Sequence, residues 1–304
     1  MFNLLSQGVG FPASGRTALI AAVIMGIALV FFLTKRARNI KETPKTAPVG
    51  APASTAASEH RGIQIGNAQH IGSRTDQQDS FGISDIKKIS NTGLLAVIGD
   101  GMGGLSNGAA YSKTAIQAAL KSFGDEKPEE KDEATLLRVL KRAREAIEAS
   151  NLKDGGTTFI AALIHDRQLH FVSVGDSRIC LMRNGGLIQL NREHVYGREL
   201  DDLAARGLLN EEDALNDQQR AAITSYLGMP DRLEVDRNIN AIPLFSGDKI
   251  VLMTDGIYNR IAEEALTELL RQAPMAAAEA IQNKILEENN PDQDNLTIII
   301  LEVE

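Results

Sequence analysis

The chain has 304 residues, of which 43% are hydrophobic, a proportion that suits one large globular domain or two small ones. Cys180 is the single cysteine, so an internal disulfide and a small secreted fold stapled by disulfides are both excluded. The net charge is −8, but residues 1–60 carry +4, which leaves −12 for residues 61–304. Such an acidic domain is a poor nucleic-acid binder; its charge either favours cations and basic partner proteins or merely keeps the surface soluble.

An uncharged apolar run, TALIAAVIMGIALVFFL, occupies Thr17–Leu33. Its 17 residues are at the short end of what spans a bilayer. Three basic residues follow it at once and only one precedes it, so the positive-inside rule places its C-terminal side in the cytoplasm. We expect a short N-terminal segment at 1–16 and a single transmembrane helix at 17–34. A cleaved signal peptide is the alternative, which the position of the basic residues disfavours.

Residues 35–60 begin with basic side chains and continue as the Pro-, Ala- and Thr/Ser-rich stretch KETPKTAPVGAPASTAASEH. This stretch has no hydrophobic period and cannot bury a core, so it predicts a disordered tether with a reach on the order of 25 Å. The sequence therefore predicts a single-pass protein of the cell membrane, with a domain of residues 61–304 facing the cytoplasm.

Within residues 61–304, strand-like runs alternate with helix-like ones in an order that does not suit a doubly wound sheet. The connectors HDRQ and NGG are hairpin signals, which favour antiparallel strands. We expect helices at 106–123, 133–150, 197–206 and 262–288, and strands at 62–66, 81–84, 94–99, 157–164, 169–174, 177–182, 187–190, 234–239, 249–253 and 295–303. Hairpins mixed with long helices indicate an α+β fold of layered antiparallel sheets with helices packed outside.

Several aspartates stand at the ends of apolar runs, next to glycine or a small polar residue. They are Asp100 in GDGMGG, Asp176 in SVGDSR, Asp255 in VLMTDG and Asp294 in DQDNLTIII, with Asp79 in GSRTDQQDS as a further candidate. Carboxylates that converge at a sheet edge repel one another unless cations neutralise them, and oxygen ligands select hard ions such as Mg²⁺ or Mn²⁺. Glycine after Asp100 permits a tight turn and lets the Gly101 carbonyl approach an ion. Any one of these motifs alone is more often only a turn.

Taken together and in this order, RTDQQD, DGMGG, GGTT, VGDSR, TDG and DN resemble the successive motifs of the metal-dependent protein phosphatases of the type 2C family. The resemblance runs over about residues 62–304 and includes LNREH at 190–194 and ITSYLG at 223–228, which are similar to the flap segment and its return in bacterial members. It implies a four-layer α/β/β/α sandwich, in which helices flank two central antiparallel sheets and a binuclear metal centre lies at one end.

The resemblance also implies a set of metal ligands. They are Asp79, Asp100, the Gly101 carbonyl, Asp176, Asp255 and Asp294. Asp100 would bridge two ions, and Asp255 and Asp294 would complete the site of the first. Asp79 and the Gly101 carbonyl would serve the second ion. Asp176 with Asp255 resembles the pair that holds a weaker third ion in some members, and the ions would be Mn²⁺ or Mg²⁺.

The implied activity is that of a metal-dependent protein-serine/threonine phosphatase. A water that bridges the two ions would attack phosphorus in line, with Arg74, Asp100 and Asp255 as catalytic residues. Arg74 occupies the position of the arginine that binds the substrate phosphate, a task suited to a planar guanidinium that donates two parallel hydrogen bonds. Asn295 would orient Asp294. The implied partners are phosphorylated proteins and an opposing Ser/Thr kinase, in a signalling role.

The chain departs from the family pattern at several positions. Gln78 stands where the family usually has glutamate, so we expect weaker binding at the second ion, although this amide can still hydrogen-bond a metal-bound water. Met102 and Leu105 replace histidines of some members, and the leaving group would then take its proton from a metal-bound water or from solvent. His194 is a substitute, but a lone histidine in a flap is more often a packing residue. We expect the GGTT stretch and Ser177 to be structural.

These departures leave a second interpretation of the domain open. It would be a weakly active or inactive relative of the phosphatases that binds phosphoproteins or scaffolds a membrane complex. Gln78 is the feature that speaks for it.

Overall fold

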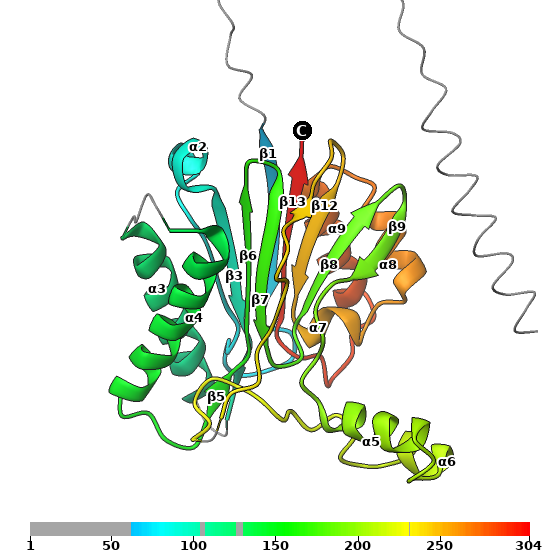
Figure 1. Ribbon diagram of the computed structural model, residues 1–304. Helices are drawn as coiled ribbons and strands as arrows, with labels where there is room; N and C mark the ends of the chain where they lie inside the picture. The colour runs from blue at the N-terminus through cyan, green and yellow to red at the C-terminus, as the bar shows by residue number, and fades with distance from the viewer. Residues whose placement is uncertain (1–61, 104–106, 126–129, 231) are drawn as a thin grey trace, which may run out of the picture. The chain divides into compact units, whose positions relative to one another are not determined.

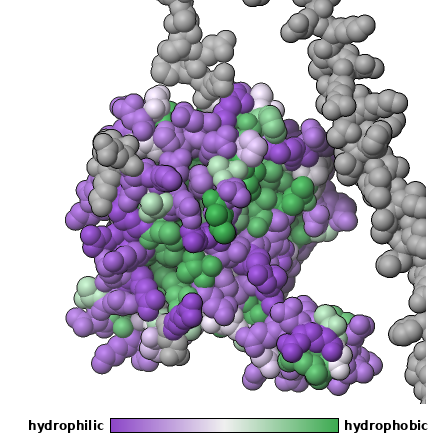
Figure 2. Space-filling view, in the orientation of Figure 1, coloured by the Kyte–Doolittle hydropathy of each residue, from purple (hydrophilic) through white to green (hydrophobic). Residues whose placement is uncertain are grey.

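Two antiparallel sheets stack face to face, and helices cover both outer faces, in a computed structural model that describes residues 62–103, 107–125, 130–230 and 232–304 (Figure 1). The segments expected at 1–16, 17–34 and 35–60 lie outside the described residues, as does Leu105. Within the described ranges, no helix combines the length and the apolarity needed to cross a bilayer. Figure 2 shows that hydrophilic residues cover most of the face seen in Figure 1, with apolar residues gathered near its middle.

Every strand pair in the structure is antiparallel. The first sheet has the order β1 (Ile63–His70), β13 (Leu296–Val303), β12 (Lys249–Met253), β8 (Arg178–Arg183) and β9 (Gly186–Gln189). The second has the order β10 (Asp236–Arg237), β7 (Gln168–Val174), β6 (Phe159–His165), β3 (Leu94–Gly99) and β2 (Ser80–Ile83), and β11 (Ile242–Pro243) also pairs with β7. A separate two-stranded ribbon joins β4 (Gly101–Met102) to β5 (Gly156–Thr157).

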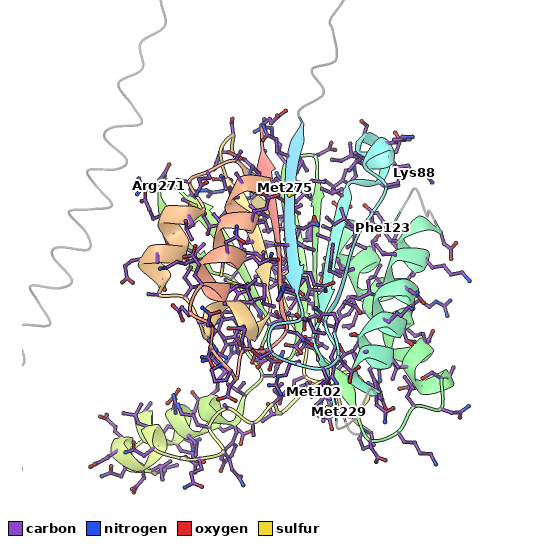
Figure 3. The ribbon with its side chains drawn as sticks, turned by 180° about the vertical axis from the view of Figure 1, so that it is seen from behind. Lys88, Met102, Phe123, Met229, Arg271 and Met275 are labelled. Carbon is purple, nitrogen blue, oxygen red and sulfur yellow. The ribbon has the colours of Figure 1, made fainter. Side chains whose placement is uncertain are left out.

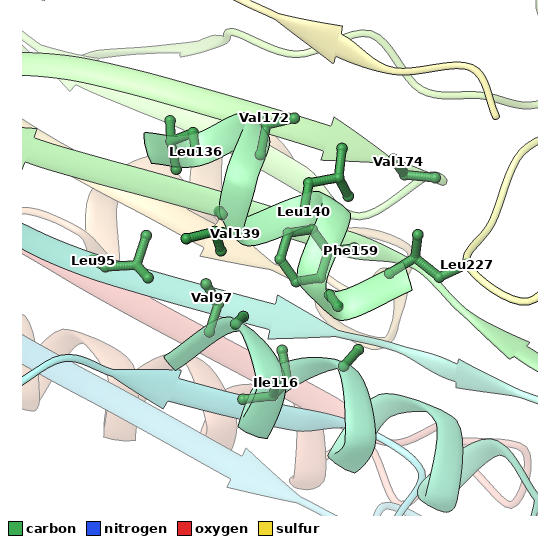
Figure 4. Close-up of a cluster of buried hydrophobic side chains, with 14 of the residues drawn as sticks. Leu95, Val97, Ile116, Leu136, Val139, Leu140, Phe159, Val172, Val174 and Leu227 are labelled. Atoms are coloured by element: carbon green, nitrogen blue, oxygen red, sulfur yellow. The ribbon is translucent and has the colours of Figure 1, made fainter. Parts of the chain in front are cut away.

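Three hydrophobic layers hold the sandwich together. The inward-facing side chains of both sheets form the middle layer, and the other faces of the sheets pack against the helices. Strand β3 is packed on both faces. Leu95 and Val97 face the helices (Figure 4). Leu94, Ala96 and Ile98 face the other sheet. Because both faces are buried, the strand has no polar alternation.

Paired helices supply the two outer layers. α3 (Asn107–Gly124) and α4 (Asp132–Ala149) cover the second sheet, and α8 (Glu263–Leu269) and α9 (Pro274–Leu286) cover the first. α5 (Tyr196–Ala205) and α6 (Glu211–Leu215) form a flap that extends from one end of the sandwich (Figure 1). Short helical turns follow β2 and β12: η1 (Ile86–Lys88), α2 (Ile89–Thr92) and α7 (Asp255–Tyr258).

The expected α/β/β/α architecture is confirmed, and so are both hairpins. At the turns, Asp166, Arg167, Asn184 and Gly185 adopt the positive φ values that tight hairpins need. Strands expected at 94–99 and 249–253 match β3 and β12.

Four expected elements need correction. The strand expected at 62–66 is longer, because β1 stays paired with β13 as far as His70. The helix expected over 262–288 is two helices, because Pro274 lacks an N–H and begins α9 at its first turn. The strand expected over 157–164 is split: Thr157 pairs with the ribbon strand β4, and β6 begins at Phe159. Only Asp236–Arg237 of the strand expected over 234–239 forms a ladder, at the edge of the second sheet.

Candidate functional site

A cavity of about 470 Å³ opens at one end of the sandwich, where loops from both sheets meet. Asp100 follows β3, Asp176 joins β7 to β8, Asp255 follows β12 and Asp294 precedes β13. Figure 3 places Met102, another lining residue, at the end of the sandwich opposite Lys88. The cavity lining also includes Arg74, Thr75, Asp76, Gln78, Gly101, Gly103, Ile223 and Asn295. The fold thus brings four of the five predicted aspartates to one cavity.

Burial and neighbouring carboxylates raise the pKa values of three of these aspartates, Asp100, Asp176 and Asp255. Burial and four surrounding aspartates raise the pKa of Asp100 well above its usual range. Burial and the charge of Asp255 raise the pKa of Asp176 to about 7. The pKa of Asp255 is raised by burial and by Asp294, and a hydrogen bond shared with the Asp100 carboxyl offsets part of this rise. These carboxylates therefore share a site that nearby positive charge would stabilise.

Asp79 is buried and does not line the cavity. It is 4% exposed, and its Oδ2 accepts hydrogen bonds from the hydroxyls of Thr254 at 3.0 Å and Thr297 at 2.7 Å. Its Oδ1 is buried and has no hydrogen-bond partner among the described residues. Burial raises the pKa of Asp79 to about 7, with smaller contributions from Asp255 and Asp294. The role of Asp79 at a second ion remains a prediction.

Gly101 brings its backbone close to a neighbouring helix. A side-chain Cβ at this position would overlap the carbonyl oxygen of Gly108 and lie 2.6 Å from that of Gln78. The N–H of Gly101 donates to the Gln78 carbonyl at 3.1 Å. Glycine is therefore required here for the close approach of the Asp100 loop to the start of α3.

Arg74 is the cationic side chain among the residues that line this cavity. Its guanidinium donates from Nη2 to Oδ2 of Asp294 at 2.8 Å. The Arg74 and Asp294 side chains are 57% and 41% exposed, so the pair remains open to solvent and contributes little to stability. The role of Arg74 in phosphate binding remains a prediction.

The donor set of the site fits a hard divalent cation. All of its candidate donors are oxygen atoms. Burial and neighbouring carboxylates raise the pKa values of Asp100 and Asp255, and the buried Oδ1 of Asp79 has no hydrogen-bond partner among the described residues. In the part of the chain that the structure describes, no three Asp, Glu, His or Cys side chains already form a cage around one point. An ion here would complete its shell with backbone oxygen and water, as Mg²⁺ usually does.

The side chains of Gln78 and Asn295 were expected to support the ligands. Asn295 accepts from the Gln78 N–H at 2.7 Å through its Oδ1 and donates to the Ile71 carbonyl at 2.7 Å through its Nδ2. Its backbone N–H donates to Oδ1 of Asp294 at 2.8 Å. The side chain of Asn295 thus fixes the loop that carries Arg74 and Gln78, and its backbone contacts Asp294.

Thr158 and Ser177 connect two of the aspartate loops. The N–H of Asp100 donates to Oγ1 of Thr158 at 2.9 Å, and the Thr158 N–H donates to the Asp100 carbonyl at 2.8 Å. The Thr158 and Ser177 hydroxyls lie 2.8 Å apart, and both residues are fully buried. Both residues are structural, as their sequence context predicts, whereas the hydrogen bond between them is not evident from the sequence. Their polarity within buried stretches was the available signal.

His194 does not line the cavity. It is 9% exposed, and its ring accepts a hydrogen bond from the Gly175 N–H at 3.0 Å through Nδ1. Burial lowers the pKa of His194. The structure therefore gives this histidine a packing position beside the Asp176 loop, which agrees with the more common role of a lone histidine.

A pH dependence of stability follows from the raised pKa values of Asp79 and Asp176. Both groups keep a proton in the folded, cation-free chain up to about pH 7, whereas unfolded aspartate releases it near 3.8. The folded state then binds more protons, so these groups lower the stability as pH rises from about 4 to 7. We expect the melting temperature of the full-length chain in EDTA to fall over this range. Asp176→Asn should flatten the slope; an unchanged slope in this variant contradicts the assignment.

The chain is similar to known proteins in both sequence and fold. The model of the family described as protein phosphatase 2C matches residues 67–289. The serine/threonine phosphatase stp of Listeria monocytogenes is 25% identical over 248 residues, which cover 77% of this chain and 95% of that protein. The crystal structure of the serine/threonine phosphatase PstP/Ppp of Mycobacterium tuberculosis has a TM-score of 0.66 at 25% identity and covers 80% of this chain and 99% of that chain. A structure of the PstP catalytic domain in complex with two manganese ions has a TM-score of 0.60 at 24% identity. The match covers 79% of this chain and 98% of that chain.

Proposed function

The chain belongs to the protein phosphatase 2C family, and we propose that it hydrolyses phosphoserine and phosphothreonine residues of proteins with the help of divalent cations bound at its aspartate-lined cavity. The family membership makes it a protein-serine/threonine phosphatase. The observation that carries the proposed chemistry is the convergence of Asp100, Asp176, Asp255 and Asp294 with Arg74 around one cavity.

The residues that would hold the cations are those with oxygen atoms at or beside the cavity. Asp100, Asp255 and Asp294 are the proposed ligands of the first, and Asp100, the Gly101 carbonyl and Asp79 those of the second. Asp176 and Asp255 are the proposed ligands of a third. When bound, Mn²⁺ or Mg²⁺ would supply the positive charge that lowers the pKa of water and stabilises charge on phosphate oxygens. Their binding would also offset the burial and the neighbouring negative charge that raise the pKa values of Asp100 and Asp255.

The chain's own residues position the phosphoester. Arg74 would donate two hydrogen bonds to phosphate oxygens, and its contact with Asp294 keeps its guanidinium at the cavity wall. The hydroxyl of Thr158 accepts a hydrogen bond from the Asp100 N–H and so fixes the backbone at this proposed ligand. The cavity lining contains Met102 and no histidine among the described residues, so we infer that solvent water in this open cavity gives the leaving alcohol its proton.

Replacing Arg74 tests its role in phosphate binding. We expect Arg74→Ala to lower kcat/KM for a phosphothreonine peptide by about 10- to 100-fold, chiefly through KM, because a charge-assisted hydrogen bond pair is lost. Arg74→Lys should recover only part of this loss, since an ammonium cannot donate in the same planar, paired geometry. Steady-state kinetics of both variants decide the matter. Equal kcat/KM values for wild type and Arg74→Ala would exclude a role for Arg74 in phosphate binding.

The test of the proposed function is hydrolysis of a phosphothreonine peptide by the full-length chain with Mn²⁺, with Mg²⁺ and with EDTA. The proposal expects turnover with a divalent cation and none with EDTA. A folded chain that binds the phosphopeptide but does not turn it over with either ion would favour the phosphoprotein-binding alternative. The observation that supports this alternative is Gln78, a neutral amide in the cavity lining, beside the proposed second ion.

We further propose that residues 17–34 anchor the phosphatase in the cell membrane, with residues 35–60 as a tether, the domain in the cytoplasm and an opposing Ser/Thr kinase acting on the same substrates. The support is the apolar run at Thr17–Leu33 and the basic residues that follow it. We expect the full-length chain to sediment with membranes and to resist extraction by salt. A chain without residues 1–60 should stay in the supernatant; equal partitioning of the two would contradict the anchor.

A further inference from the structure

Three polar side chains form a row across the first sheet, at the end that carries the cavity. Gln69 of β1 is paired in register with Thr297 of β13, and Thr254 directly follows β12 on the other side of β13. The Thr254 N–H donates to the Thr297 carbonyl at 3.1 Å. Both threonines are fully buried, and Thr297 shares the inward face of β13 with Ile299 and Leu301. Three polar side chains therefore replace the apolar layer at this level.

The hydrogen bonds of the row determine where the two threonine protons point. The Gln69 side-chain nitrogen donates to Oγ1 of Thr297 at 3.1 Å and to the carbonyl of Asp79 at 3.2 Å, which fixes the orientation of the amide. The Thr297 N–H donates to Oγ1 of Thr254 at 3.0 Å. Each hydroxyl thus already accepts a hydrogen bond, and each has a single proton left to donate.

Both protons are donated to the same carboxylate oxygen. Thr297 and Thr254 lie 2.7 Å and 3.0 Å from Oδ2 of Asp79, which accepts from both. The other oxygen, Oδ1, is buried and has no hydrogen-bond partner among the described residues. A buried oxygen atom left in this state is costly unless a ligand completes it.

We propose that Thr254 and Thr297 are positioning residues that hold Asp79 by Oδ2 and thereby present Oδ1 to the cation site. The inference rests on the proposed function, because it concerns the same divalent cations. Gln69 is the third member of the arrangement, since its amide directs the Thr297 proton toward Asp79. None of the three needs to touch the ion, its water or the substrate to exert this effect.

Removing one hydroxyl tests the proposal. Thr297→Val keeps the shape of the side chain but removes the donor, and Thr297→Ser keeps the donor. We expect calorimetric titration of the full-length chain with Mn²⁺ alone to show binding at least about tenfold weaker in Thr297→Val, and close to wild type in Thr297→Ser, as supporting hydrogen bonds to metal ligands usually behave. Thr254→Val should also weaken binding and serves if Thr297→Val does not fold. Thr92→Val, which alters a half-buried threonine of α2 outside the cavity lining, is the matched control and should bind as wild type.

A double-mutant cycle separates positioning from a general loss of stability. In an Asp79→Asn chain, Thr297→Val should weaken Mn²⁺ binding no further, because the hydroxyl acts through the carboxylate that is already gone. Wild-type affinity in Thr297→Val, equally weak binding in Thr297→Ser, or a further loss in the Asp79→Asn background would overturn the proposal. If the wild-type chain itself bound no Mn²⁺, that result would contradict the proposed function, whereas the outcomes above contradict only the positioning role of the threonines.

Discussion

Asp100→Asn is expected to lower Mn²⁺-dependent kcat/KM for a phosphothreonine peptide by about 10³-fold or more while leaving the melting temperature in EDTA unchanged or higher. The large loss is expected because Asp100 is the proposed bridging ligand, and the loss of charge stabilisation at a reaction centre typically costs this much. The stability should not fall because burial and the surrounding aspartates already raise the pKa of Asp100 well above its usual range. A neutral amide of similar shape therefore removes repulsion from the cation-free fold.

Two measurements check this expectation on the same preparations. Steady-state hydrolysis with saturating Mn²⁺ gives kcat/KM, and thermal melts with EDTA and with Mn²⁺ give the stabilisation by the cation. We expect Mn²⁺ to raise the melting temperature of the wild type more than that of Asp100→Asn. Asp166→Asn is the control, since its exposed hairpin position has a positive φ that asparagine accepts. An Asp100→Asn chain with wild-type kcat/KM would exclude Asp100 from the mechanism.

Gly101→Ala is expected to destabilise the fold and to remove most of the activity, although it adds a single methyl group. The new Cβ would overlap the Gly108 carbonyl and press on the carbonyl of Gln78, and both are backbone atoms that cannot swing aside. Overpacking of this kind costs about 1–3 kcal/mol or more. For a domain of this size, each kcal/mol lowers the melting temperature by roughly 2–4 °C. The displaced Asp100 loop would also move a proposed ligand.

Gly124→Ala provides the matched comparison for this prediction. Gly124 ends α3, and a Cβ there would meet no atom within 4 Å. We expect this variant to melt at or slightly above the wild-type temperature, because alanine reduces the freedom of the unfolded chain. Differential scanning calorimetry in EDTA compares the two variants directly. If Gly101→Ala melted as high as Gly124→Ala, the close approach of the Asp100 loop to α3 would not hold in solution.

The parts of the fold that the sequence predicted well are those in which local pattern and burial agree. β3 and β12 are buried on both faces, so their continuous apolar runs show their length. The prediction of one helix over 262–288 is wrong. The apolar period continues on both sides of Pro274, but an α-helix cannot continue through this proline without a break. The strand expected over 234–239 is short in the structure because β10 lies at the edge of the second sheet and pairs with β7 alone.

The candidate site was predictable as a set of residues but not as an arrangement. Asp100, Asp176 and Asp255 stand beside strand ends in the sequence, which was enough to select them. Asp79 is buried and held by Thr254 and Thr297, which follow it in the chain by 175 and 218 positions. No local pattern encodes such contacts. The polar Thr297 within the apolar strand β13 was the available trace of this arrangement.

The most direct test of the account is an anomalous difference map from crystals of the chain grown with Mn²⁺ under conditions that support hydrolysis. We expect manganese peaks in the cavity, within bonding distance of carboxylate oxygens of Asp100, Asp255 and Asp294. Strong peaks elsewhere with none in this cavity, from a chain that is active with Mn²⁺, would contradict it.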